Sequence, residues 1–109
     1  MDQVHTTSAT GPIEPEIVDV PTHHRFEARV GDTVAGFAEY RDHDRDGATV
    51  RTFPHTVVEE EYGGRGIAGN LARTALDDAR QRGMTVVPRC SFFAAFIRKH
   101  PEYADLVAG

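Results

Sequence analysis

The stretch that decides the fold is residues 61–70, Glu-Tyr-Gly-Gly-Arg-Gly-Ile-Ala-Gly-Asn, which joins an apolar, strand-like run to an amphipathic helical pattern. Gly63, Gly64 and Gly66 allow positive φ angles and put no side chain in the way of a ligand. The N–H groups of this loop and of the first helical turn can converge on one point, where the positive end of the helix dipole favours an anion. The stretch therefore predicts a phosphate cradle.

The patterns on either side of the loop predict the other elements. Apolar and polar residues alternate as in half-buried strands. We expect strands at 17–20, 26–30, 33–40, 48–53, 55–59 and 85–88, with a two-residue turn at 31–32 and a polar turn at 41–47. Apolar residues at helical spacing predict a core-facing helix over 67–82, and an aromatic-rich helix follows over 92–100. The expected fold is α+β, an α/β sandwich with a mixed, mostly antiparallel sheet.

The composition is that of one small soluble domain. The chain has 109 residues, a hydrophobic fraction of 39% and a net charge of −5. This charge argues against nucleic-acid binding, which usually needs a basic surface. No apolar run approaches the ~20 residues of a membrane span, and residues 1–10 do not resemble a signal peptide. We expect a flexible tail over 1–16 and a single domain over 17–109.

The single cysteine, Cys90, excludes an intramolecular disulfide, which fits a reducing compartment. We therefore expect a cytoplasmic protein, and a monomer. Residues 42–47, Asp-His-Asp-Arg-Asp-Gly, resemble the start of a calcium loop, but the twelfth position is Phe53 rather than glutamate and strands flank the segment. His23 and His24 have no partners at metal-ligand spacing, so no metal is expected.

The glycine pattern by itself allows several functions. A nucleotide P-loop needs Gly-Lys-Ser/Thr, which this loop lacks. Gly64, Gly66 and Gly69 match the G-x-G-x-x-G of dinucleotide-binding folds. Such folds place an acidic residue at the end of the next strand, whereas this chain has residues 88–90, Pro-Arg-Cys, there. A structural connector that allows close helix packing is the remaining possibility.

The order of elements resembles the GCN5-related N-acetyltransferases, the GNAT superfamily, over about residues 26–107. The acetyl-CoA motif of that family reads Q/R-x-x-G-x-G/A, and Gly66 and Ala68 take its fourth and sixth positions. Gly63 takes the first position, where the family has Gln or Arg, so this chain lacks that side chain. The longer string of residues 55–58, 64–68, 87–90 and Tyr103 is similar to the minimal YjdJ-type subgroup.

The resemblance implies a GNAT-like sheet with a binding site for acetyl-CoA as cosubstrate. In the family, the strand before the glycine loop is splayed from the strand after the helix, and the pantetheine arm pairs with the first strand in the gap. The residues implied against pantetheine are Thr56, Val57 and Val58. The residues implied around the pyrophosphate are Gly63, Gly64, Arg65, Gly66, Ile67, Ala68, Gly69 and Asn70.

Two side chains are candidates for catalysis. Cys90 stands beside Arg89 and near the start of the last helix, and both features would stabilise a thiolate. The resemblance puts it near the acetyl thioester, where it could accept the acetyl group. His55, at the entry of the proposed CoA strand, could take the proton of an incoming ammonium. The alternatives are a buried thiol that only packs and a structural histidine at a strand end.

The expected function is transfer of an acetyl group from acetyl-CoA to an amine, either a protein or peptide lysine or a small amine. The amine would attack directly, or Cys90 would first take the acetyl group. Glu39 and Glu59 are other candidate bases, and Tyr103 either protonates the leaving thiolate or packs the C-terminal tail. A CoA-binding module without catalysis and a nucleotide-binding domain are the alternative functions.

Overall fold

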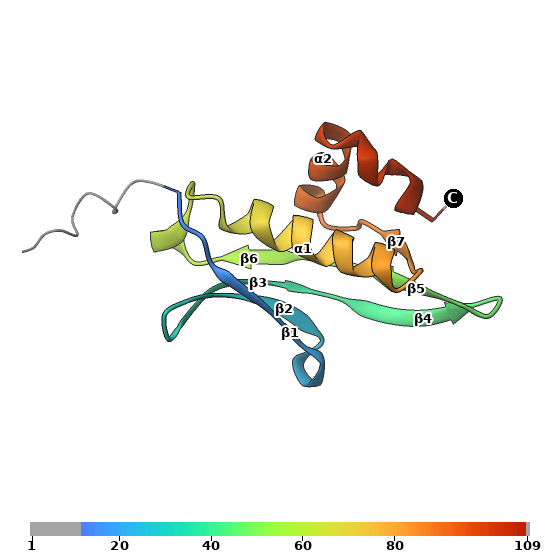
Figure 1. The fold of residues 1–109 in the computed structure, drawn as a ribbon, viewed down its shortest axis with the longest axis horizontal. Coiled ribbons are helices and arrows are strands. Elements are labelled where there is room, and N and C mark those ends of the chain that lie inside the picture. The colour runs from blue at the N-terminus through green and yellow to red at the C-terminus, as the bar shows by residue number, and fades with distance from the viewer. Residues whose placement is uncertain (1–11, 109) are drawn as a thin grey trace, which may run out of the picture.

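One long twisted hairpin forms the centre of the fold in the computed structural model, which describes residues 12–108 (Figure 1). Its first arm is β3 (Thr33–Glu39) followed by β4 (Arg41–Arg45), and its second arm is β5 (Ala48–Thr52) followed by β6 (Thr56–Val58). β4 pairs with β5 and β3 pairs with β6, both antiparallel. The second arm is interrupted at residues 53–55, where Pro54 has no N–H to give to a ladder.

The remaining strands extend this hairpin into two sheets. β1 (Glu16–Val20) and β2 (Arg25–Val30) join β3, so that the first sheet has the antiparallel order β1-β2-β3-β6. β7 (Thr85–Val87) lies parallel to β5, which gives the second sheet the order β4-β5-β7. The expected mixed and mostly antiparallel arrangement is confirmed, and the break in the second arm divides it into two sheets.

The segment 41–47 corrects a prediction. We expected a polar turn there, but residues 41–45 form β4, and only Asp46 and Gly47 make the turn, with φ angles of 54° and 86°. Every residue of β4 is exposed, and the strand lies at a sheet edge. Charged residues are common on edge strands because they oppose pairing with other chains. A polar sequence therefore forms a strand here because β5 supplies its partner.

The helices cover one side of the sheets (Figure 1). α1 (Ile67–Gln81) turns its apolar stripe inward, with Ile67, Leu71, Ala72, Ala75, Leu76 and Ala79 buried. Each large apolar side chain buried in this way contributes about 1.5–3 kcal/mol. α2 (Ser91–Lys99) follows β7, and the Phe93 ring stacks on Phe53 with centroids 4.4 Å apart. Both predicted helices are confirmed within one residue at each end.

The C-terminal segment packs back onto this core. A short 3-10 helix, Pro101–Leu106, follows α2, and its Tyr103 is buried. The Tyr103 hydroxyl donates to Asp77 Oδ1 on α1 at 2.7 Å. Burial, together with this hydrogen bond, raises the pKa of Tyr103. The alternative in which Tyr103 packs the tail therefore agrees with the structure.

The N-terminal segment also contacts the core. Residues 1–11 of the predicted tail lie outside the described part of the chain. Ile13 packs against the core and donates its N–H to Arg65 O at 3.1 Å, and β1 begins at Glu16. The packed structure therefore begins at least as early as Ile13.

None of the helices within residues 12–108 is long and apolar enough to cross a membrane.

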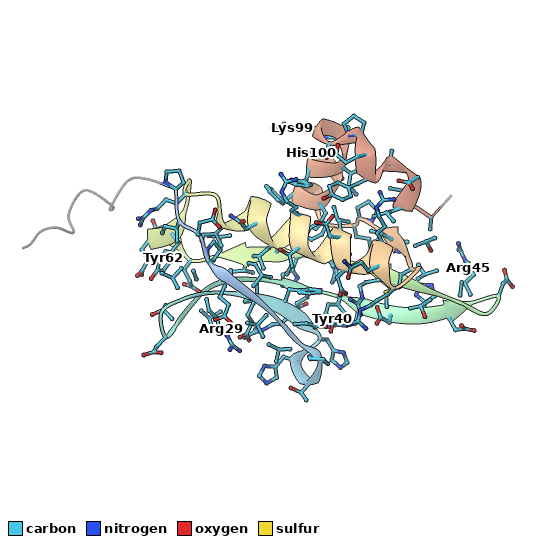
Figure 2. All side chains as sticks on the ribbon, viewed as in Figure 1. Arg29, Tyr40, Arg45, Tyr62, Lys99 and His100 are labelled. Atoms are coloured by element: carbon cyan, nitrogen blue, oxygen red, sulfur yellow. The ribbon has the colours of Figure 1, made fainter. Side chains whose placement is uncertain are left out.

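A buried cation, Arg51, joins the second sheet to α1, where its Nη1 donates to Asp78 Oδ2 at 3.4 Å. Arg51 is 3% exposed and holds Asp42 with two hydrogen bonds of 2.7 and 2.8 Å. Its guanidinium lies 3.7 Å from the centroid of the Tyr40 ring. Tyr40 lies where β3 meets β4, near the middle of the molecule (Figure 2), and its hydroxyl donates to Asp19 Oδ1 at 2.6 Å. Burial first, and then the hydrogen bond to Asp19, raise the pKa of Tyr40 to about 12.

The raised pKa of Tyr40 predicts a loss of stability in alkali. The folded state favours the neutral phenol, so the stabilisation is complete below the ordinary pKa of 10 and is lost as the pH rises through about 12. Full ionisation should cost about 2–3 kcal/mol of unfolding free energy. Urea unfolding of the wild type and Tyr40→Phe across this range checks the prediction. The stability difference between them should shrink as pH rises, and parallel curves would contradict it.

Candidate functional site

The free edge of β6 forms one wall of the candidate site. Two main-chain hydrogen bonds set its register against β3, from Glu39 N to His55 O (3.1 Å) and from Glu59 N to Ala35 O (2.8 Å). Main-chain groups alternate in direction along a strand. Because His55 and Glu59 bond to β3, the main-chain groups of Val57 also point to β3, where Val57 pairs with Phe37. The N–H and C=O groups of Thr56 and Val58 point to the open edge. Thr56 and Val58, but not Val57, can therefore pair with an extended ligand.

Cys90 lies beside the start of β6. β5 and β7 stay paired as far as Thr52 and Val87, after which Phe53 N donates to Val87 O at 3.0 Å. Cys90 N then donates to Phe53 O at 2.9 Å, and the Cys90 thiol donates to Thr56 Oγ1 at 3.4 Å. Cys90 is 9% exposed. Cys90 and Thr56, two predicted site residues from separate parts of the chain, are therefore in contact where β6 and the segment after β7 diverge.

The glycine loop turns the chain sharply into α1. Gly64 and Gly66 have φ angles of 72° and 89°, which favour glycine. Gly63 is extended, with φ −64°, and its N–H donates to Glu60 O in the 3-10 helix Glu60–Tyr62. The amide of Gly63 is therefore already bonded, so the N–H groups that remain for an anion begin at Gly64.

The start of α1 presents donors without a capping side chain. Its N-cap is Gly66, which has no side chain to cap the first turn, and that turn holds no acidic residue. The first helical bond runs from Asn70 N to Gly66 O, so the N–H groups of Ile67, Ala68 and Gly69 have no acceptor within the helix. N–H groups without a helical acceptor and the positive end of the dipole together suit an anionic ligand.

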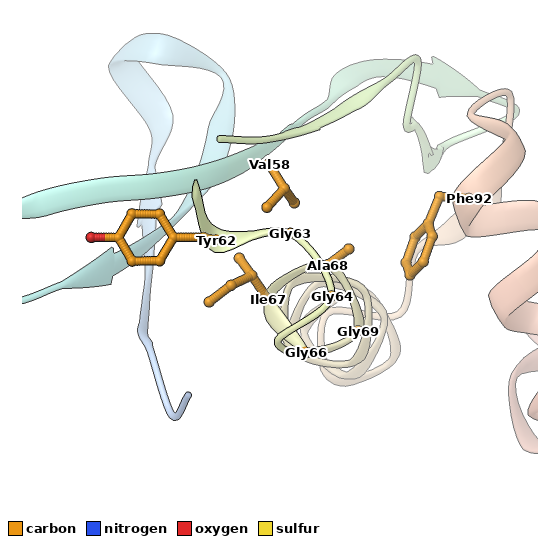
Figure 3. Close-up of a pocket in the computed structure, with 9 residues that line it drawn as sticks. All are labelled: Val58, Tyr62, Gly63, Gly64, Gly66, Ile67, Ala68, Gly69 and Phe92. Atoms are coloured by element: carbon orange, nitrogen blue, oxygen red, sulfur yellow. The ribbon is translucent and has the colours of Figure 1, made fainter. Parts of the chain in front are cut away.

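A pocket of about 310 Å³ lies over this helix start (Figure 3). Seven predicted residues line it, namely Val58, Gly63, Gly64, Gly66, Ile67, Ala68 and Gly69. Tyr62 and Phe92 complete the lining. Figure 3 shows Val58 and Phe92 on either side of the first turn of α1, so the pocket connects the glycine loop with the gap between β6 and α2.

Two predicted loop residues make internal contacts instead. The Asn70 amide donates through Nδ2 to Gly66 O at 2.8 Å. The Arg65 carbonyl accepts the N–H of Ile13. Neither residue lines the pocket. The contacts of Arg65 and Asn70 with the pyrophosphate stay predictions. Both residues lie in or next to the loop that would hold the pyrophosphate.

His55 lies on the other face of the first sheet. A Cβ on Gly36 would come within 3.3 Å of Ile67 Cγ2, so the face that carries Gly36 and its partner Val58 is the one that α1 covers. Side chains alternate between the two faces of a strand, so His55, three residues before Val58, lies on the opposite face. There His55 Nε2 lies 3.7 Å from Glu39 Oε1, and its ring packs edge-on against Phe37. The His55 side chain is 54% exposed there. The two catalytic candidates therefore stand on opposite sides of β6.

Sequence reasoning missed one residue that lines the pocket. Tyr62 was not predicted, although an aromatic residue directly before a glycine loop is a usable signal. Phe92, from the predicted aromatic-rich helix, is 36% exposed and also lines the pocket. Within residues 12–108, no three His, Cys, Asp or Glu side chains are grouped so as to hold a metal ion.

The comparisons with known proteins agree with this geometry. Residues 25–106 match the model of a family described as GCN5-related N-acetyl-transferase. The match covers most of the chain, and the protein therefore belongs to this family, whose members use acetyl-CoA as cosubstrate. A search of curated proteins found no significant match.

Solved structures show the same fold. A GCN5-like protein from Staphylococcus aureus superposes with a TM-score of 0.64 at 24% identity, covering 86% of this chain and 88% of that one. A ribosomal-protein-alanine N-acetyltransferase from Brucella melitensis biovar Abortus 2308 gives 0.57 at 23% identity, covering 78% of this chain and 61% of that one. At these identities the likeness establishes the fold, and the GNAT-like architecture is confirmed.

Proposed function

We propose that this protein transfers the acetyl group of acetyl-CoA to an amine. The observation that carries the proposal is the order of three features, from the start of α1 along the free edge of β6 to Cys90. The uncapped start of α1 suits a pyrophosphate, the free edge of β6 suits an extended pantetheine arm, and Cys90 meets Thr56 at the base where the thioester would end. The three features follow the order of the chemical groups in the cosubstrate.

The main chain of β6 supplies the electrophilic assistance in this proposal. The Val58 N–H and C=O would pair with the amides of pantetheine. The Thr56 N–H, close to Cys90, would donate to the thioester oxygen as negative charge develops on it. Such a fixed donor costs no reorganisation during the reaction. Binding both reactants in one gap adds the advantage of proximity.

Two routes to the amine fit this arrangement. In the direct route, the amine attacks the thioester carbon, the carbon–sulfur bond breaks, and CoA leaves as the thiol after gaining a proton. His55, on the face of β6 away from Cys90, would receive the proton of an amine approaching from that face. In the covalent route, Cys90 sulfur forms the new thioester, its proton passes to CoA sulfur, and the amine then attacks acetyl-Cys90.

The proposal is tested with isotope-labelled acetyl-CoA and three classes of acceptor: a lysine-containing peptide set, a polyamine and a protein lysate. Transfer of label to an amine supports acetyl transfer and names the acceptor class. Tight binding of acetyl-CoA without transfer to any acceptor would favour a CoA-binding module. The lack of a polar side chain at Gly63, where the family motif has one, is the feature that favours this second candidate.

Intact mass measurement after incubation with acetyl-CoA tests the covalent route. We expect the wild type to gain the mass of one acetyl group and Cys90→Ala to gain none. Cys90→Ser is a matched variant, because it retains a nucleophile and changes little volume at a site that is 9% exposed. Unchanged turnover in Cys90→Ala, with no mass gain in the wild type, would assign the direct route.

A further inference from the structure

The N-terminal segment 12–15 lies against the glycine loop, far from it in sequence. Ile13 donates its N–H to the carbonyl of Arg65 at 3.1 Å, one residue before the N-cap of α1. The Ile13 side chain packs against the core, which keeps the segment in place. Figure 1 shows the segment that precedes β1 passing close to the turn that leads into α1.

This hydrogen bond fixes the orientation of one peptide group in the loop. The Arg65–Gly66 peptide is planar and trans, so its N–H points opposite to its C=O. With Arg65 O held by Ile13, the Gly66 N–H points away from the Ile13 N–H, and Gly66 lines the pocket whereas Ile13 does not. The next carbonyl, Gly66 O, is held by Asn70 through both its main-chain N (3.1 Å) and Nδ2 (2.8 Å).

The two peptide groups that flank Gly66 are therefore both restrained. Gly66, at φ 89°, would otherwise have the wide conformational freedom of glycine. A loop that must order itself on binding loses affinity, whereas a loop already held in its bound shape does not. A carbonyl that accepts a hydrogen bond also polarises the N–H of the same peptide group, which strengthens it as a donor.

We propose that Ile13 is a positioning residue for the cosubstrate: its N–H holds the Arg65–Gly66 peptide so that the Gly66 N–H faces the pyrophosphate of CoA. The proposal rests on the proposed function, because it assigns the anion at this loop to CoA. The role belongs to the main chain of Ile13, and the side chain serves only to keep the segment packed.

Three variants separate the hydrogen bond from the packing. Ile13→Pro removes the N–H in a segment that already contains Pro12 and Pro15. Ile13→Ala keeps the N–H and removes most of the apolar side chain. Glu14→Pro is the matched control, because it places the same ring at the adjacent, exposed residue.

Calorimetric titration with CoA gives the readout. Ile13→Pro should bind about fivefold more weakly, the factor expected for one hydrogen bond, while Ile13→Ala and Glu14→Pro should stay within about twofold of the wild type. Wild-type affinity in folded Ile13→Pro would overturn the proposal, as would a larger loss in Ile13→Ala than in Ile13→Pro. Absence of CoA binding in the wild type itself would overturn the proposed function instead.

Amide hydrogen exchange in the wild type provides a second test that needs no variant. Coupling between two sites is reciprocal, so CoA that binds the Gly66 N–H should strengthen the bond from Ile13 on the same peptide. Exchange of the Ile13 amide should slow by about fivefold in the presence of saturating CoA. An Ile13 exchange rate that CoA leaves unchanged would overturn the proposal even if Ile13→Pro fails to fold.

Discussion

A Gly64→Asp variant is expected to bind acetyl-CoA at least about 100-fold more weakly than the wild type, because a fixed negative charge about 4 Å from a phosphate costs on the order of 4 kcal/mol near a protein surface. Gly64 lines the pocket beside the start of α1, and a Cβ there would meet no atom within 4 Å. Its φ of 72° is a conformation that Asp tolerates better than most residues. The variant should therefore fold, and calorimetric titration measures the loss.

Two controls separate charge from backbone strain. Gly64→Asn has almost the same shape and the same tolerance of positive φ, but no charge, so it should retain most of the affinity. Gly83→Asp places the same side chain at a nearly identical φ of 71°, also in open space, beyond the far end of α1. It should lose stability but not CoA affinity. Equal binding by Gly64→Asp and the wild type would show that no anion sits at this loop.

The parts of the fold that follow from local pattern were predictable from the sequence. The glycine loop and α1 depend on turn chemistry and on a 3.6-residue apolar period, both of which are visible in residues 61–82. β4 was missed because its five residues are charged or polar, and only its pairing with β5 makes them a strand. Local propensity cannot show a partner that the chain supplies later.

The candidate site was predictable only in part, for a similar reason. The loop residues could be placed by motif, and most of them line the pocket. Choosing Thr56 and Val58 over Val57 required the register against β3, because a shift of one residue reverses every main-chain group. The contact between Cys90 and Thr56, and the bond from Ile13 to the loop, join segments far apart in sequence. No local pattern encodes such contacts.

Gly36→Ala is expected to lower the unfolding free energy by about 3 kcal/mol, at the upper end of overpacking costs. The new Cβ would come within 2.6 Å of Val57 O and 3.2 Å of Val58 Cα, both main-chain atoms that cannot swing aside as a side chain can. Relief requires β6 to move away from β3. Thermal unfolding should show a loss on the order of 15 °C in Tm, and CoA affinity should fall because Val58 would be displaced.

Gly69→Ala gives a control with the opposite sign. Its Cβ would lie 4.0 Å from Phe96 Cε1, an ordinary contact, and Gly69 lies inside α1. Replacing a helical glycine by alanine should raise stability by about 0.5–1 kcal/mol. The two substitutions add the same methyl group, so opposite shifts in Tm would establish that the approach of β6 to Gly36 is limiting. A Gly36→Ala variant as stable as the wild type would mean that β3 and β6 are further apart than the structure places them.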